Sequence, residues 1–162
     1  MAENIKNLSM NIVVDDGSRR VPIMNTSGEE IGAFTFHPTD IGIIQRYNDL
    51  ADRFDGIVAP LEALSAEADD LLDITDPRYA GALGEAAERL YDAVNTLLGS
   101  GDAAQAFFGS MNPFSPVDGD FYCTRVLDAL GSYIGSAFET ETAKFSDKAK
   151  KYAKKATRSA SR

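Results

Sequence analysis

The sequence predicts a mostly helical α+β fold, in which a small N-terminal antiparallel β meander packs on a bundle of three to four helices and a basic C-terminal helix projects. Three observations support this prediction. Short β-branched runs fill residues 10–37, apolar residues recur every three or four positions over 40–138, and lysines multiply where that stripe thins. We therefore expect a flexible N-terminus at 1–9, a single α+β domain at 10–143, and a basic helical or disordered tail at 144–162.

The predicted meander has three strands. Asp16-Gly17 separates the β-branched residues 11–14 from those at 21–23, which indicates a hairpin because glycine tolerates the positive φ of a tight turn. A second turn at 26–30 precedes a third strand with Phe34 and Phe36 on one face. Pro22 has no N–H group, so its strand is expected to be interrupted or at a sheet edge. A sheet this small needs a helical partner.

The first predicted helix follows Pro38-Thr39-Asp40, where Thr39 or Asp40 caps the first turn. Apolar residues then keep helical spacing from 43 to 72 and acidic residues fall between them. Pro60 removes the hydrogen bond to Gly56, so we expect a break or kink there. The apolar phase continues past it, so both halves are expected to line one seam.

The next two helices also carry start and stop signals. Thr75-Asp76-Pro77 begins a second amphipathic helix that ends at 99–101. A short helix at 102–108 is expected to be capped by Asp102 and stopped by Gly109. Three glycines inside helical patterns indicate close helix packing or local weakness: Gly84, Gly131 and Gly135.

An aromatic corner occupies residues 107–130. Five of the fifteen Phe and Tyr residues lie between Phe107 and Tyr122, together with two prolines and two glycines. The prolines and glycines predict that no regular element crosses this stretch, and the aromatics predict that it is packed. We expect it to join the acidic body to a final helix that starts near 118–120.

The net charge of −9 hides an asymmetry. Residues 144–162 contain eight basic side chains and one acid, which is +7, whereas residues 1–143 contain 8 basic and 24 acidic side chains, which is −16. The basic tail suits either nucleic acid phosphates or an acidic protein surface. Phe145 and Tyr152 are seven residues apart, which favours a helix that docks in a groove. The acidic body argues against binding nucleic acid with the whole domain.

Nothing in the sequence indicates catalysis or a cofactor. Cys123 and His37 are each the only residue of their type, which excludes an intramolecular disulfide and a thiolate zinc cluster and removes most nucleophile–histidine pairs. We expect Cys123 in the core and His37 in a structural or surface role. No apolar run reaches the roughly 18–20 residues of a membrane span, and a signal peptide pattern is absent, so a cytosolic protein is expected.

Two acidic patterns resemble magnesium sites. Asp69-Asp70-x-x-Asp73 matches the aspartate-rich motif of terpenoid synthases, but those enzymes need a second cluster and a longer chain. Two pairs of acids with i,i+3 spacing also resemble the magnesium-binding motifs of all-α nucleotide pyrophosphohydrolases. The two motifs occur here in the opposite order along the chain. Solvation of a helix surface explains both patterns more simply. The paired acids are Glu67 with Asp70 and Glu85 with Glu88.

The aromatic corner carries a family resemblance. Residues 107–123, the helix that follows and its Lys-rich end resemble small proteins from tailed phages and prophages of Gram-positive bacteria, and residues 34–47 resemble the same group. Some members are described as tail assembly chaperone-like. The resemblance implies a phage structural-assembly protein that binds the tape-measure and tail-tube proteins without catalysis, in the host cytoplasm. The resemblance also allows the protein to form a homo-oligomer.

Two other functions remain open at this point. One is a virion structural or head–tail accessory protein that stays in the particle, and the other is an acidic inhibitor of a host defence protein. The residues expected to contact a partner are aromatic or basic side chains in the corner and the C-terminal helix: Phe114, Tyr133, Phe145, Lys148, Lys151, Tyr152 and Lys155.

Overall fold

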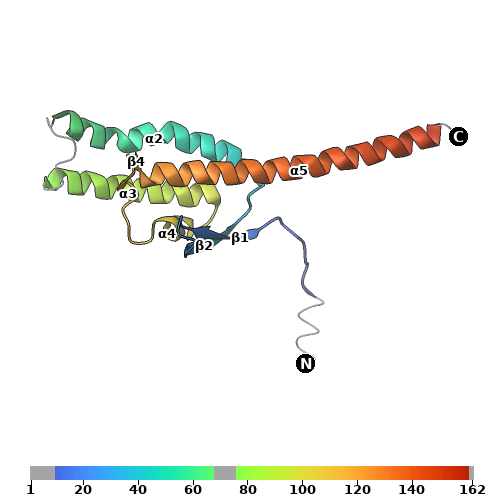
Figure 1. Ribbon diagram of the computed structural model, residues 1–162, viewed down its shortest axis with the longest axis horizontal. Helices are drawn as coiled ribbons and strands as arrows, with labels where there is room; N and C mark the ends of the chain where they lie inside the picture. Colours follow the sequence, from blue (N-terminus) through green and yellow to red (C-terminus); the bar gives the residue numbers. More distant parts are fainter. Residues whose placement is uncertain (1–9, 68–75, 161–162) are drawn as a thin grey trace, which may run out of the picture.

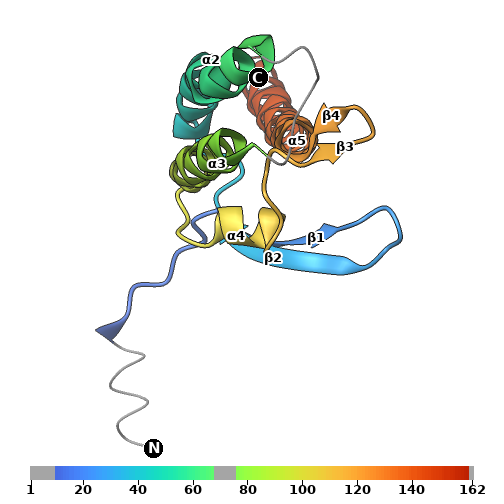
Figure 2. The ribbon, with the colours of Figure 1, turned by 90° about the vertical axis from the view of Figure 1, so that its left-hand side faces the viewer.

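The computed structural model describes residues 10–67 and 76–160, with side chains at 10–64 and 76–151. It confirms a mostly helical α+β fold with a small antiparallel sheet. α2 (Gly42–Glu67), α3 (Pro77–Leu98) and the first half of α5 (Tyr122–Ala160) form a bundle. The hairpin of β1 (Arg19–Met24) and β2 (Glu30–Phe36) lies on the α3 side of this bundle with α4 (Ala103–Phe108), as Figure 2 shows.

The sheet in this part of the chain has two strands where three were predicted. β1 and β2 pair antiparallel from Arg19 opposite Phe36, with an irregularity between Ile23 and Met24. The turn between them is the predicted one: Asn25 Oδ1 accepts hydrogen bonds from the Ser27 and Glu29 amides. Phe34 and Phe36 share the buried face, with ring centroids 5.0 Å apart.

The hairpin predicted at Asp16-Gly17 is wrong, because residues 11–18 form no strand. The Asp15 and Asp16 carboxylates instead accept hydrogen bonds from the Gly17 and Ser18 amides. Asp16 also lies 2.9 Å from His37 Nε2 at the end of β2, and this hydrogen bond holds the Asp16 pKa well below its usual range. These local bonds fix the segment beside the sheet without adding it as a strand.

α2 begins as predicted and continues without a break through Pro60. The Asp40 carboxylate accepts a hydrogen bond from the Gly42 amide, and its carbonyl accepts one from the Ile43 amide. Arg46 joins the helix to its neighbour by donating from Nε to the Leu97 carbonyl at 2.9 Å. On both sides of Pro60 the same face stays buried, at Leu50, Ile57, Val58 and Leu61.

α3 has the predicted ends. Asp76 Oδ1 accepts a hydrogen bond from the Arg78 amide, and Gly99 ends the helix in the left-handed conformation with φ 62°. The cap predicted for α4 is wrong, since the Asp102 side chain makes no capping hydrogen bond. Asn95 of α3 takes this role by accepting from the Ala104 amide at 2.9 Å.

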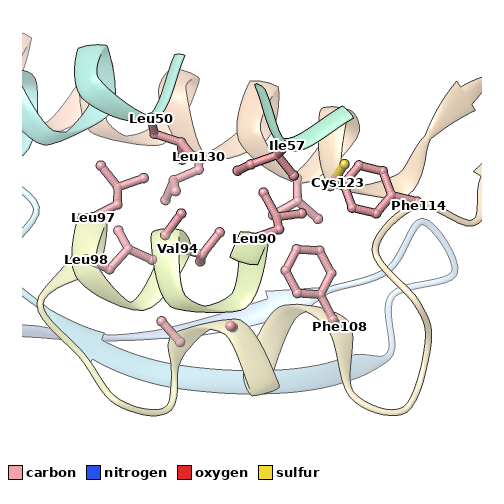
Figure 3. Close-up of a cluster of buried hydrophobic side chains, with 14 of the residues drawn as sticks. Leu50, Ile57, Leu90, Val94, Leu97, Leu98, Phe108, Phe114, Cys123 and Leu130 are labelled. Carbon is pink, nitrogen blue, oxygen red and sulfur yellow. The ribbon is translucent and has the colours of Figure 1, made fainter. Parts of the chain in front are cut away.

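The core lies between the helices and under the aromatic corner (Figure 3). α3 lies at its centre, with Leu90 and Val94 fully buried. Phe108 reaches this core from α4, and Cys123 and Leu130 reach it from α5. The described residues contain no buried polar side chain and no buried side-chain N or O atom without a hydrogen-bond partner.

α5 is one helix of 39 residues, which at 1.5 Å per residue is about 59 Å long. It begins at Tyr122, slightly later than predicted, because a small hairpin precedes it. That hairpin pairs β3 (Pro116–Val117) with β4 (Asp120–Phe121), so a regular element does occur in the corner. Phe138 still packs against the core. The C-terminal part of the helix extends beyond the other elements, as Figure 1 shows. We call residues 139–160 the stalk.

Candidate interaction surface

The aromatic corner is a packed part of the core. Phe114 is 2% exposed, and its ring meets Phe121 edge-on with centroids 5.3 Å apart. The Tyr122 hydroxyl donates to the Phe107 carbonyl at 2.9 Å, and the Cys123 amide donates to the Pro113 carbonyl at 2.8 Å. The inclusion of Phe114 among the partner-contact residues is therefore wrong, since its ring is enclosed by the protein's own residues.

The other predicted contact residues all lie on α5. Phe145 is 72% exposed, and Lys148 and Lys151 are exposed beside it on the stalk. Tyr133 is 42% exposed but belongs to the bundle, with its ring 6.1 Å from that of Phe36. The helix backbone includes Tyr152 and Lys155, whose side chains lie outside the described residues. Of the residues that the sequence singled out, the stalk therefore exposes Phe145, Lys148 and Lys151 near one another within the described side chains.

A groove between α2 and α5 was not predicted. Its wider part has a volume of about 330 Å³ and its narrower part about 230 Å³, and Tyr47 lines both. We call the two parts together the α2–α5 groove. The wider part is lined by Ile43, Ile44, Tyr47, Asn48, Gly131, Ile134, Gly135 and Phe138. The narrower part is lined by Tyr47, Leu50, Ala51, Phe54, Thr124, Leu127 and Asp128.

The two glycines of α5 play different roles in this groove. A Cβ at Gly131 would lie 3.1 Å from the Tyr47 hydroxyl, which itself donates to the Leu127 carbonyl at 3.3 Å. Gly131 thus permits close packing of Tyr47 on α5. A Cβ at Gly135 would meet nothing within 4 Å, so this glycine leaves the groove floor open. The pair of glycines is the sequence signal at this surface, and it indicates close packing on α5 without specifying the helix that packs there.

Carboxylates border the groove. Asp128 lines its narrower part. The pKa of Tyr47 is raised above its ordinary value, first by burial of the Tyr47 hydroxyl and second by the negative charge of Asp128. Asp55 is exposed on α2 one turn beyond the groove residue Ala51, and Glu62 is exposed further along the same helix. The groove therefore combines an apolar floor with an acidic border.

A second exposed apolar segment precedes the sheet. Ile12, Val13 and Val14 are 94%, 92% and 76% exposed in a stretch without regular structure, which Figure 1 shows leading away from the bundle. The sequence prediction placed these residues in a strand. Their β-branched side chains are those that strands favour, but β1 pairs only with β2 in the described residues.

The structure describes only some of the side chains that the sequence offers for chemistry. His37 contacts Asp16 on the surface, and Cys123 is buried. Within the described residues no cluster of three His, Cys, Asp or Glu side chains is placed to hold a metal ion. Glu85 and Glu88 are exposed on α3. Asp69, Asp70 and Asp73, and the side chain of Glu67, lie outside the described residues.

We expect the Cys123 thiol to be inert in the folded protein. Burial raises its pKa from 9.0 to about 11, which lowers the thiolate fraction at pH 8 about a hundredfold, and the thiolate is the reactive form. A thiol-reactive disulfide reagent at pH 8 should therefore label the native chain negligibly and label one thiol per chain after denaturation. Rapid labelling of the native protein would show that the core opens at this end of α5.

Comparison with known proteins identifies no relative: no protein-family model, curated protein or solved structure matches this chain. No described helix is both long enough and apolar enough to cross a bilayer. The interpretation of the surface therefore rests on its geometry and its charges.

Proposed function

We propose that this protein is a phage structural-assembly protein, a tail assembly chaperone that binds tape-measure and tail-tube proteins through the stalk without catalysis. The single observation that carries a binding role is the stalk itself. α5 continues for 22 residues beyond Phe138, and it exposes Phe145 to solvent over 72% of its surface. A large aromatic ring on a projecting amphipathic helix is the arrangement by which helices dock into apolar grooves of partners.

The assignment to phage tails rests on the sequence resemblance in the aromatic corner and in residues 34–47. The structure adds a reason for the corner's composition. Its packed rings and the β3–β4 hairpin fix the start of α5, so the corner sets the direction in which the stalk leaves the bundle. In this proposal the corner positions the binding element, and the stalk makes the contact with the client.

Co-expression with the tape-measure and tail-tube proteins of the same phage genome, followed by affinity capture, tests this function. We expect capture of at least one client by the full chain and its loss in Phe145→Glu, because a carboxylate would have to be desolvated at the contact. Ile31→Glu is the matched control, since Ile31 is 45% exposed on β2, far from the stalk in sequence.

Two outcomes would count against this function. If the wild-type chain captures neither client at micromolar concentration, the chaperone role is wrong. If Phe145→Glu captures both clients as well as wild type, the stalk is not the binding element. Mass spectrometry of purified virions separates one of the two alternatives, because many copies per particle would indicate a virion accessory protein.

A further inference from the structure

The α2–α5 groove and the stalk are parts of one face of α5. Gly131 and Phe138 line the groove, and Phe145 follows seven residues after Phe138. Seven residues are close to two helical turns of 3.6, so these three positions fall nearly in line. The apolar stripe that forms the groove wall therefore continues onto the stalk, where Phe145 is mainly exposed.

The two ends of this stripe carry opposite charge. Asp128 of α5 lines the groove, and Asp55 of α2 is exposed one turn beyond the groove residue Ala51. Near Phe145 the stalk presents Lys148 and Lys151 together with the acids Glu141 and Asp147. The balance is basic, because residues 144–162 together have a charge of +7 against −16 for the rest of the chain. A basic helix with an apolar stripe is thus complementary to the groove of the same protein.

We propose that the α2–α5 groove is the docking site for the stalk of a second copy of this chain. Phe145 of one copy lies against the apolar lining of the other copy's groove, and the stalk lysines lie beside Asp55 and Asp128. The groove and the stalk are at opposite ends of α5, so two copies dock reciprocally when their α5 helices run antiparallel. The result is a two-fold dimer with two identical contacts.

The groove has room for this contact. A buried cavity of about 150 Å³ is enough for a benzene molecule, so the wider part, at about 330 Å³, accommodates a phenylalanine ring. Gly135 adds no side chain to the floor, which lets another helix approach closely. Ile44, 49% exposed, would be covered in the dimer together with Phe145.

Charge favours this arrangement over parallel pairing of two stalks. Parallel pairing would place two segments of +7 side by side, and like charges at close range are destabilising. Antiparallel docking places each basic segment on the acidic part of the other copy. The contact is therefore expected to weaken with salt, because the charges at its border are exposed and screened.

Light scattering coupled to gel filtration of the full chain at about 50 µM provides the first test. At low salt we expect an apparent mass of twice the chain mass of 17.5 kDa. Phe145→Glu and Ile44→Glu should each reduce it to the mass of one chain, whereas the control Met24→Glu, at a 52% exposed position on β1, should leave it unchanged. One molar NaCl should raise the dissociation constant on the order of tenfold.

Mixing the two disrupted variants gives the decisive test. Phe145→Glu retains an intact groove and Ile44→Glu retains an intact stalk, so an equimolar mixture has one of the two reciprocal contacts intact. We expect the mixture to form a one-to-one dimer that neither variant forms alone. This recovery also shows that both variants are folded, which thermal unfolding of each confirms.

Three results would overturn the proposal: a wild-type chain that is monomeric at 50 µM, a mixture in which both variants stay monomeric, or an Ile44→Glu variant that remains a dimer while Phe145→Glu does not. The last result would indicate that the stalks pair with each other. The proposal does not depend on the chaperone function, since these measurements use the purified chain alone. Phe145 serves both contacts, so a client and a second copy exclude each other on the same stalk. Client capture can still fail while the dimer forms, and the dimer can fail to form while a client is captured.

Discussion

Replacing Phe114 with alanine is expected to destabilise the fold by about 3–5 kcal/mol, the usual cost of removing a buried phenylalanine ring. The ring is 2% exposed and packs edge-on against Phe121. Its removal leaves a cavity at the point where the corner joins α5. For a chain of this size, that loss corresponds to a melting temperature lower by roughly 6–20 °C.

Phe145→Ala is the matched control for this measurement. It removes the same ring from a site that is 72% exposed, so we expect a change within about 0.5 kcal/mol for the monomer. Both variants should be measured by chemical denaturation at a concentration below dimer formation. Equal stability of Phe114→Ala and wild type would mean that the ring is exposed in solution, and would restore the corner as a candidate binding surface.

Gly32→Ala is expected to have the second large effect, a loss of about 3 kcal/mol, the upper end of the usual cost of overpacking. A Cβ at Gly32 would lie 2.3 Å from the carbonyl oxygen of Ala106 in α4. The obstacle is backbone rather than a side-chain tip, so β2 and α4 would have to move apart. That movement disturbs the contact of Phe34 with Phe107, whose ring centroids are 5.1 Å apart.

The control for Gly32→Ala is the same substitution at Gly84. This glycine lies inside α3, where a Cβ would meet nothing within 4 Å, and alanine is the better helix former by about 1 kcal/mol. Gly84→Ala should therefore raise the denaturation midpoint while Gly32→Ala lowers it. A stable Gly32→Ala variant would show that β2 and α4 are not in close contact in solution.

Most of the fold was predictable because its elements have local signals. α3 is the clearest case: Asp76 before Pro77 and Gly99 after Leu98 mark its ends, and helical spacing places Leu90 and Val94 on the buried side. Such capping bonds and apolar faces depend on residues close in sequence. The same reasoning gave the turn at 26–30 and the helix after Asp40.

The two Asp-Gly pairs show where local signals stop deciding the structure. Asp118-Gly119 forms the β3–β4 turn with both residues at positive φ, 51° and 88°, whereas Asp16-Gly17 forms no hairpin. The difference arises from tertiary contacts. The Asp16 carboxylate is engaged by His37, while the flanks of Asp118-Gly119 are held between the packed Phe114 and the start of α5.

The candidate site was predictable in part. The stalk residues came from composition and from the seven-residue spacing of Phe145 and Tyr152, which are properties of one helix. The groove combines Ile44 and Tyr47 of α2 with Gly135 of α5, some ninety residues apart in the sequence. Its existence depends on how two helices are set against each other, which a single sequence without contacts does not specify.

The continuity of α5 has a mechanical consequence. The helix is held in the bundle over its first half, and the 22 residues of the stalk span about 33 Å beyond it. A rigid helix of that length acts as a lever, so a tilt of about 10° at the groove moves its tip by roughly 6 Å. A molecule that widens or closes the groove around Tyr47 would thereby move the lysine-rich end. A force on that end would in turn change the spacing between α2 and α5 at the groove.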